Sequence, residues 1–301
     1  MFLCGIKSKM KKLLFAIIFL FSTVCHAKID VVFAIDNNYP IYAMLMINSI
    51  MKNNVSNSDY TFWVLETGVT DENKTKMTDY VKSVGQEIKF ITVPSKYIEE
   101  WQKLYKKHIT PIAMSRILIP ELLPQEIEKA LYLDCDMLVA EDLKTLFDED
   151  LGDKYVGMVQ DQLWHREKYM NAGVMLFNMP LWRINEMSQK MMIYLKQHEK
   201  EFSCAGKYPF WITPGCYVYQ DQDLIHLFLR NKTKELDPKW NNEDIKNEDV
   251  NMENQRGIYH YIGGGERKPW NSQVSAPQRL YMLYWRQSPL APEIKNYSNF
   301  K

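Results

Sequence analysis

The feature that most constrains this chain is a short apolar run, residues 131–133, that ends on two aspartates separated by one residue, Asp134 and Asp136. The run predicts a buried strand, and a second apolar run follows the pair at residues 137–139. Carboxylates at the end of a buried strand are unfavourable unless they are paired or bind a cation. Ligands of open α/β sheets bind at this end of the strands, and two carboxylates offer oxygen ligands to Mg²⁺ or Mn²⁺. The segment therefore predicts a metal-bridged phosphate or nucleotide site.

The spacing is weak evidence by itself, because Asp-x-Asp occurs three times in the chain. Asp148 and Asp150 lie in a polar stretch that predicts a solvated loop, and the third pair is Asp221 with Asp223. What distinguishes the first pair is the apolar run on each side of it. On the motif alone, structural or solvated carboxylates remain the alternative.

The composition predicts a globular protein and gives no sign of a nucleic-acid surface. The 301 residues are 46% hydrophobic and 13% aromatic, which is ample for a sizeable core in one large domain or two small ones. Lys and Arg together number 37, as do Asp and Glu, so the net charge is zero. Binding to nucleic acid would need a basic excess, so we expect no nucleic-acid partner.

The first 27 residues differ from the rest of the chain. Lysines between positions 7 and 12 precede an apolar stretch at 13–24, and Ala27 fits a cleavage position. The apolar stretch is short for a membrane span. We therefore expect residues 1–27 to be a signal peptide or a short signal anchor. The protein would then be secretory, lumenal or membrane-associated, and it would act on the cytosolic face if the leader stays uncleaved.

Three cysteines follow this leader: Cys135, Cys204 and Cys216. An odd number argues against a disulfide scaffold. Cys204 and Cys216 either pair in an oxidising compartment or are two free buried thiols.

From residue 28 onward, predicted strands and helices alternate. We expect strands at 29–35, 60–66, 88–93, 131–139, 155–160 and 174–177, and helices at 41–52, 71–84, 114–123 and 184–200. This alternation predicts an α/β fold with a mostly parallel central sheet and helices on both faces. In the last helix, one face is expected to pack in the core through Ile184, Met187, Met191 and Leu195. Residues 231–256 predict a long surface loop, and the aromatic segment 279–286 either covers the core or touches a membrane.

Two further polar clusters lie at predicted strand ends. Asp36, Asn38 and Tyr39 follow the first strand and could hold a base and a ribose, although an Asn/Asp turn is the alternative. His260 precedes a glycine-rich basic loop that contains Gly263 and Lys268. Glycines let backbone N–H groups approach a phosphate, and a lysine supplies positive charge.

Together these clusters resemble glycosyltransferase family 8, which includes lipopolysaccharide galactosyl- and glucosyltransferases and glycogenin. The resemblance extends from about residue 29 to 270. It rests on residues 30–39, Ser115-Arg116, 131–139, 171–178, Trp182-Arg183, Asp221-Gln222-Asp223, His260 and Lys268-Pro269-Trp270.

The resemblance implies one nucleotide-sugar domain of the GT-A type at residues 28–270. We expect the tail at 271–301 to pack on or near this domain. The resemblance also implies a UDP-hexose donor (glucose or galactose), a glycan or lipopolysaccharide-type acceptor, and Mn²⁺ or Mg²⁺. The implied metal ligands are Asp134, Asp136 and His260. The implied donor-binding residues are Ala34, Asp36, Asn38, Tyr39, Arg116, Asn171, Ala172, Gly263 and Lys268. Asp161, Asp221 and Gln222 would act around the transferred sugar.

Members of this family transfer with retention at the anomeric carbon. A double displacement would need a nucleophile, for which Asp221 and Gln222 are the matching candidates. Because the amide of Gln222 is neutral, we favour a same-face route in which the departing phosphate helps deprotonate the acceptor. The chain departs from the family in a short segment between Asp161 and Asn171 and in a long loop at 262–267.

Two other functions fit parts of the pattern. Phosphatases of the haloacid dehalogenase class also place Asp-x-Asp after a strand. In that class the pair lies near the N-terminus, and Thr or Val stands two residues after the second aspartate. This chain has Leu138 at that position. A non-catalytic protein that binds nucleotide sugars or glycans could also keep the fold. A pair of buried carboxylates that binds no cation would then destabilise the fold.

Overall fold

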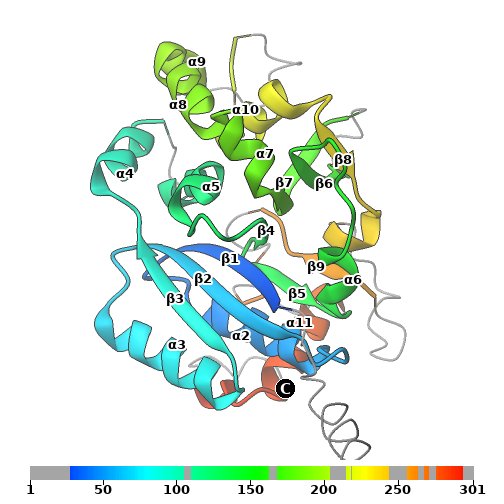
Figure 1. Cartoon of the computed structure of the whole chain (residues 1–301). Helices are drawn as coiled ribbons and strands as arrows, with labels where there is room; N and C mark the ends of the chain where they lie inside the picture. Colours follow the sequence, from blue (N-terminus) through cyan, green and yellow to red (C-terminus); the bar gives the residue numbers. More distant parts are fainter. Residues whose placement is uncertain are drawn as a thin grey trace, which may run out of the picture.

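The computed structural model describes residues 28–104, 110–162, 168–203, 215–217, 219–243, 256–263, 268–270 and 276–293. A seven-stranded sheet, ordered β3-β2-β1-β4-β7-β6-β8, runs through the molecule, and a small second sheet pairs β5 with β9 (Figure 1). The strands are β1 (Lys28–Asp36), β2 (Asp59–Thr67), β3 (Glu87–Thr92), β4 (Lys129–Leu133), β5 (Met137–Val139), β6 (Val156–Gln160), β7 (Met170–Asn178), β8 (Thr233–Glu235) and β9 (Ile258–His260).

The helices lie mainly between consecutive strands in the sequence. The α-helices are α2 (Pro40–Lys52), α3 (Asp71–Ser83), α4 (Ser95–Gln102), α5 (Ile119–Leu122), α6 (Leu143–Phe147), α7 (Met179–Ile184), α8 (Met187–Gln197), α9 (Glu199–Phe202), α10 (Gln220–Leu229) and α11 (Ala276–Arg286). The 3₁₀ helices are η2 (Pro111–Leu118), η3 (Pro238–Asn241) and η6 (Ala291–Glu293).

Most pairs in the large sheet are parallel, as the alternation of strands and helices predicts. β1 pairs in parallel with β2 and β4, and β2 pairs in parallel with β3. β7 is the exception, because it runs antiparallel to both β4 and β6. The expected α/β class with a mostly parallel sheet is therefore confirmed.

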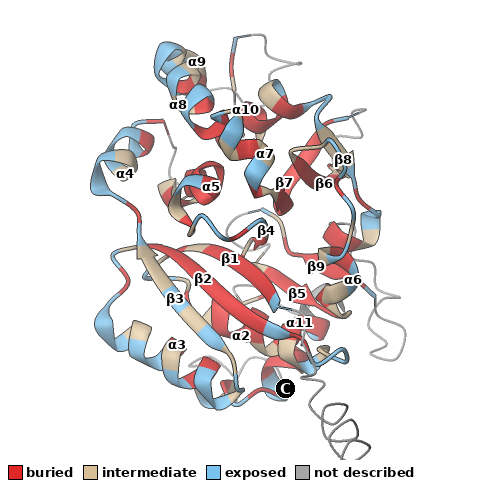
Figure 2. Ribbon diagram, viewed as in Figure 1, coloured by how far each residue is buried: buried red, intermediate tan, exposed pale blue. Residues whose placement is uncertain are grey.

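Apolar side chains on both faces of the sheet explain why helices cover it on both sides. On β1, Val31, Phe33 and Ile35 join one core cluster with α2, α3 and α11, whereas Val32 joins a second cluster with η2, α7, α8 and α10. Successive residues of a strand point to opposite faces, so a strand this apolar has to be buried on both. Figure 2 shows the central strands as buried.

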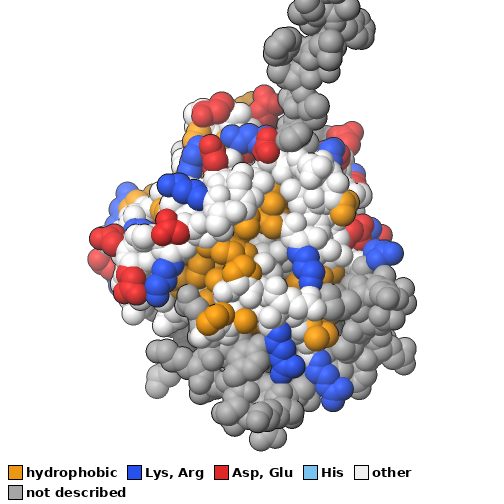
Figure 3. Space-filling model, turned by 90° about the horizontal axis from the view of Figure 1, so that it is seen from below, with side chains coloured by type: hydrophobic (Ala, Val, Ile, Leu, Met, Phe, Trp, Pro, Cys, Tyr) orange, Lys and Arg blue, Asp and Glu red, His pale blue; other side chains and the backbone are white. Residues whose placement is uncertain are grey.

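The aromatic segment near the C-terminus packs into the first of these clusters. Leu280, Tyr281 and Trp285 of α11 are at most 5% exposed. Figure 3 looks onto this side of the molecule, where hydrophobic side chains gather among lysines and arginines. Among the described residues, none of the helices combines the length and the apolar character that a membrane crossing requires.

The predicted helix at 184–200 is wrong in one respect, because the structure interrupts it. α7 ends at Ile184, Glu186 adopts a left-handed conformation with φ of +51°, and α8 begins at Met187. Met187, Met191 and Leu195 are buried as expected, but Ile184 is 80% exposed. The break rotates α8 relative to α7, so Ile184 does not share the buried face.

The predicted surface loop at 231–256 is also partly wrong. It contains β8 and the turn η3, in which Trp240 and Asn241 are buried. The Asp237 side chain accepts a hydrogen bond from the Lys239 N–H and so starts the turn. The strand predicted at 131–139 is divided at the acidic pair into β4 and β5, and the helix predicted at 114–123 is divided into η2 and α5.

Some expectations concern residues outside the described part of the chain. These are the leader at 1–27, the short segment at 163–167, Cys204, Gly264 and Gly265. Cys135 is a free buried thiol. Cys216 is disulfide-bonded, so the free-thiol alternative is wrong for it, and its partner lies outside the described residues.

One arginine holds the connection between α5 and β4 in place. The Arg183 guanidinium donates five hydrogen bonds of 2.7–3.1 Å to backbone carbonyls. The acceptors are the carbonyls of Pro120, Leu123, Pro124, Gln125 and Ile127. A planar fork with five donors suits such a cluster, whereas a lysine ammonium has three donors at one point.

We expect Arg183→Lys to lower the free energy of unfolding by about 2–3 kcal/mol, because part-buried carbonyls lose charged donors. Urea unfolding at equilibrium measures this loss. Arg230→Lys, at an exposed site after α10, is the control and should change stability by less than about 0.5 kcal/mol. Equal stability of the two variants would contradict this role for Arg183.

Candidate functional site

Strand order brings two segments of the chain together at the carboxyl end of β4. β4 ends at Leu133, and Asp134 follows directly. Because β7 runs antiparallel to β4, residues 171–173 at its start lie beside that end. The Asp134 N–H donates to the Gly173 carbonyl at 2.9 Å. The first aspartate therefore leaves the large sheet next to the start of β7.

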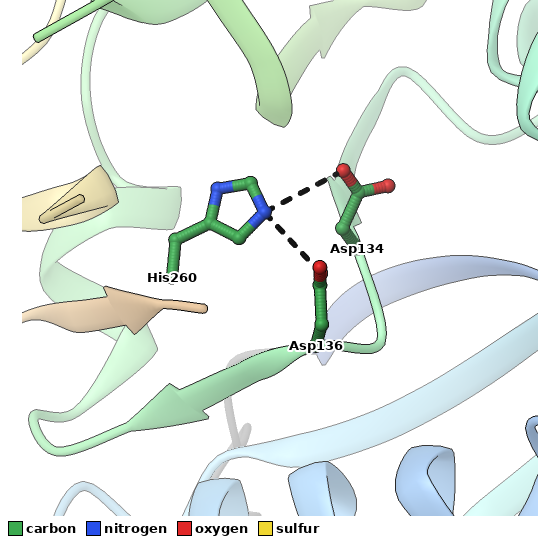
Figure 4. Close-up of side chains that lie close together, drawn as sticks. All are labelled: Asp134, Asp136 and His260. Atoms are coloured by element: carbon green, nitrogen blue, oxygen red, sulfur yellow. Dashed lines mark ion pairs between the residues drawn. The ribbon is translucent and has the colours of Figure 1, made fainter. Parts of the chain in front are cut away.

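The second aspartate lies where the chain passes into the small sheet. β5 starts at Met137 and pairs antiparallel with β9, with Met137 opposite His260. The Tyr261 N–H donates to the Asp136 carbonyl at 2.9 Å. This pairing brings a histidine from far along the sequence beside the acidic pair (Figure 4).

The three side chains converge on one point. His260 Nε2 lies 3.2 Å from Asp136 Oδ1 and 3.8 Å from Asp134 Oδ2. One ligand atom from each residue lies within 4.8 Å of the others. His260 is 4% exposed, so its imidazole faces the two carboxylates in a largely buried position. Two carboxylates and an imidazole form a donor set suited to a divalent cation.

Asp134 is compensated by an arginine that approaches from η2. Arg116 Nη2 donates to Asp134 Oδ1 at 3.0 Å, and the Tyr132 hydroxyl donates to the same oxygen at 2.5 Å. The guanidinium also stacks over the Tyr132 ring at 4.7 Å. Burial nevertheless raises the pKa of Asp134, and the nearby charge of Asp136 adds to this, although Arg116 opposes both.

Asp136 is compensated by two cations from the C-terminal part of the chain. The Lys268 ammonium contacts Asp136 Oδ2 and donates to the Tyr261 carbonyl at 3.0 Å. Burial disfavours the charged carboxylate, but Lys268 and His260 outweigh it and lower the pKa of Asp136. Burial lowers the pKa of His260, but the nearby charge of Asp136 raises it by more, so the pKa lies above its usual value. Positive charge thus gathers beside Asp136.

The other side of the His260 ring contacts asparagines. His260 Nδ1 lies 2.9 Å from Asn241 Oδ1, and Asn241 Nδ2 donates to Asn171 Oδ1 at 2.9 Å. The Gly173 N–H donates to the same Asn171 oxygen at 2.7 Å. The sequence did not indicate Asn241, because it lies in a stretch whose polarity predicts a loop. Asp237-Pro238 indicates a turn there but not its burial.

Five of the residues expected around the donor sugar form one network. Gln222 accepts the Ala172 N–H at 2.9 Å and donates to Asp161 Oδ2 at 3.1 Å. Arg116 donates to the Ala172 carbonyl at 2.6 Å, and its Nε lies 2.9 Å from Asp221 Oδ2. The network therefore joins η2, the end of β6, β7 and α10.

The other two Asp-x-Asp pairs do not resemble the first. Asp223 accepts hydrogen bonds from the Tyr169 hydroxyl at 2.7 Å and the Tyr219 N–H at 3.0 Å, which is a structural role at the start of α10. Asp148 and Asp150 are exposed, as the predicted solvated loop requires.

The segment after β1 forms the turn that its sequence allows. Asp36 Oδ1 accepts the Asn38 N–H at 2.8 Å, and the half-buried Tyr39 ring packs edge-on against Trp270 at 6.3 Å. Burial and the nearby charge of Asp136 raise the pKa of Tyr39. Ala34 is half-buried near the end of the same strand. This turn therefore lies close to the acidic pair.

Gly263 follows β9 in the sequence and precedes Lys268. Its φ is +94°, which favours glycine, and the residue is exposed. The glycines that follow it lie outside the described residues. The structure thus brings Asp134, Asp136, His260 and Lys268 together, with Tyr39 nearby.

Gly173 is required by the position of the His260 ring. A Cβ at this position would lie 2.4 Å from His260 Cε1 and 2.8 Å from Met137 Cε. We expect Gly173→Ala to cost about 2–3 kcal/mol of unfolding free energy through overpacking, measured by urea denaturation. Gly157→Ala is the control, because its Cβ would meet movable leucine methyls at 3.0 Å. A Gly173 variant no less stable than this control would contradict the close packing.

Comparisons with known proteins agree with this geometry. The family model described as "Glycosyl transferase family 8" matches residues 30–274. General stress protein A of Bacillus subtilis is 28% identical over 278 residues, covering 83% of this chain and 91% of that protein. Lipopolysaccharide 1,3-galactosyltransferase of Salmonella typhimurium is 23% identical, and the alignment covers 85% of this chain and 77% of that enzyme.

The fold also matches that of solved enzymes. A crystal structure of galactosyltransferase LgtC, in complex with donor and acceptor sugar analogues, superposes with a TM-score of 0.67 at 24% identity. The match covers 85% of this chain and 95% of LgtC, which confirms the expected GT-A-type fold. Two streptococcal glycosyltransferases are much longer, and the matched region makes up 24% and 34% of them. The haloacid dehalogenase alternative is therefore set aside, and the chain belongs to glycosyl transferase family 8.

Proposed function

We propose that this protein is a retaining, metal-dependent glycosyltransferase. It transfers glucose or galactose from a UDP-sugar to a glycan or lipopolysaccharide-type acceptor. The observation that carries the proposal is the convergence of Asp134, Asp136 and His260 on one point, in a chain that belongs to a glycosyltransferase family.

The donor set fits the divalent cation that the family implies. Two carboxylate oxygens and one imidazole nitrogen face one another from three segments, and Asp134, Asp136 and His260 would hold the ion. When bound, Mn²⁺ or Mg²⁺ would neutralise charge that develops on the departing diphosphate. The Lys268 ammonium contacts Asp136, beside the proposed metal site. It is therefore placed to form an ion pair with a phosphate oxygen of the bound donor.

The turn after β1 supports a nucleoside site next to the metal. The Tyr39 ring is half-buried and close to the acidic pair, so it can stack on a base while the diphosphate lies at the carboxylates. Asp36 and Asn38 offer polar groups for the ribose, and Ala34 leaves space at the end of the strand. Gly263 and Lys268 would contact the phosphates.

The network around Gln222 supports the same-face route. Its amide oxygen accepts the Ala172 N–H and its amide nitrogen donates to Asp161, so both ends of the amide are engaged. Asp221 is likewise ion-paired with Arg116. In the same-face route the bond from the anomeric carbon to phosphate breaks and the bond to the acceptor oxygen forms on one side of the sugar. The acceptor proton passes to the departing phosphate, and these residues hold the sugar.

We expect Asp136→Asn to abolish metal-dependent transfer, with at least a 100-fold loss as an order of magnitude, because a charged ligand becomes neutral. UDP release from UDP-glucose and UDP-galactose, with and without Mn²⁺, measures the effect. Asp150→Asn, in the exposed Asp-x-Asp pair, should keep wild-type activity.

The same assays separate an enzyme from a binding protein. The transferase proposal predicts Mn²⁺-dependent UDP release by the wild-type protein. Mn²⁺-dependent binding of UDP, without hydrolysis or transfer of any UDP-sugar, would instead show a non-catalytic nucleotide-sugar binder and would overturn the proposal.

We expect Gln222→Ala to keep measurable transferase activity, lowered by roughly 10- to 100-fold, because positioning is impaired while no covalent step is removed. Initial rates and the product anomer, the latter determined by NMR, test this. Complete loss of activity in a folded Gln222→Ala protein that still binds UDP would argue for a covalent role and against the same-face route.

A further inference from the structure

We propose that Asn241 is a positioning residue that keeps a proton on His260 Nδ1, so that Nε2 is the atom left to ligate a cation held between the two aspartates. The proposal rests on the proposed metal site and extends it to residues behind the histidine. Asn241 is fully buried, and each end of its amide has one partner: His260 at the oxygen and Asn171 at the nitrogen.

The direction of each hydrogen bond follows from one backbone group. A backbone N–H can only donate, so the Asn171 atom that meets the Gly173 N–H at 2.7 Å must be its oxygen. That oxygen also faces the Asn241 amide at 2.9 Å, so the Asn241 atom must be the nitrogen. The Asn241 oxygen is then left to face His260 Nδ1 at 2.9 Å.

His260 must therefore carry a proton on Nδ1. Nε2 lies 3.2 Å from Asp136 and 3.8 Å from Asp134, so without a metal it also faces acceptors, and a ring protonated on both nitrogens fits the site. A neutral imidazole has one N–H and one lone pair, so when a cation displaces the Nε2 proton, the Nδ1 proton stays with Asn241 and the lone pair lies on Nε2. Amide orientations are usually ambiguous, but here the backbone donor fixes both of them and with them the proton on Nδ1.

The segment that carries Asn241 is held on both sides. The Gln162 side chain donates to the Asn241 carbonyl at 3.2 Å, and the His260 N–H donates to the Asn242 carbonyl at 2.9 Å. Gly173, which begins the relay, also lacks the Cβ that would collide with the His260 ring. The relay and the ring position thus depend on the same short segment at the start of β7.

A group that orients a metal-binding histidine typically contributes to affinity without touching the metal. The relay holds the ring with Nε2 toward the aspartates before a cation arrives, so less reorganisation is needed on binding. It also links the metal site to Asn171, which lies in the region expected to contact the donor sugar.

The first test uses the wild-type protein with saturating Mg²⁺, which is diamagnetic. Nitrogen-15 NMR of the imidazoles, with His260 assigned by its absence in His260→Gln, reports which nitrogen carries a proton. We expect a proton on Nδ1. An Nδ1 without a proton overturns the proposal, and this test does not depend on any Asn241 variant folding.

The second test uses Mn²⁺ titration of Asn241 variants. Asn241→Leu removes both ends of the relay, and we expect about a 10- to 100-fold weaker Mn²⁺ affinity with part of the His260 proton moved to Nε2. Asn241→Asp keeps an acceptor for Nδ1–H, so it should restore the Nδ1 proton and bind Mn²⁺ more tightly than the leucine variant. Wild-type affinity and an unchanged tautomer in Asn241→Leu would overturn the proposal.

A matched control separates positioning from stability. Asn53 also makes side-chain hydrogen bonds in a part-buried position, to Ser49, Val139 and Tyr284. Asn53→Leu should lower stability but leave the Mn²⁺ affinity and the His260 tautomer unchanged. If the wild-type protein shows the Nδ1 proton but binds no Mn²⁺, the relay stands and the metal-dependent function fails. If it binds Mn²⁺ while Nδ1 carries no proton, the metal site stands and the proposed role of Asn241 fails.

Discussion

Charge compensation at a buried acidic pair organises this molecule. Asp134 and Asp136 lie between the two sheets, where two neighbouring carboxylates without partners would be strongly destabilising. Arg116 approaches from η2, and His260 and Lys268 approach from β9 and the segment after it. The pair therefore ties together parts of the chain that are distant in sequence.

The topology serves this convergence in two ways. Parallel pairing of β1, β2 and β4 places their carboxyl ends at one edge, and the antiparallel β7 adds the segment that contains Asn171 and Gly173. The small sheet of β5 and β9 then fixes the register of His260 against the residue that follows the acidic pair. Because the chain passes from the large sheet to the small one at Asp134–Asp136, side chains from both sheets meet at this site.

Much of this arrangement could be predicted from the sequence, and the reasons for the failures are physical. The two aspartates could be predicted because a carboxylate directly after an apolar run is a strong local signal. The family resemblance indicated His260 as their partner. The break at Glu186 was missed because the apolar spacing continues across it. Asn241 was missed because burial of a polar turn is decided by tertiary packing, which local composition does not report.

The partners of the donor-side residues could not be predicted either. The sequence placed Gln222 near the sugar, but its bonds to Ala172 and Asp161 depend on how α10 meets β7 and β6 in space. The same holds for the five carbonyls that Arg183 gathers.

The order of β4 and β9 in the chain has a consequence for biosynthesis. Domains fold as they emerge from the ribosome, N-terminal parts first. Strands β1 to β4 can assemble while the residues that neutralise the acidic pair have yet to be translated. A nascent chain that stops short of residue 260 would carry two carboxylates without their histidine and lysine, so the site around Asp134 and Asp136 is completed only after His260 and Lys268 have been translated.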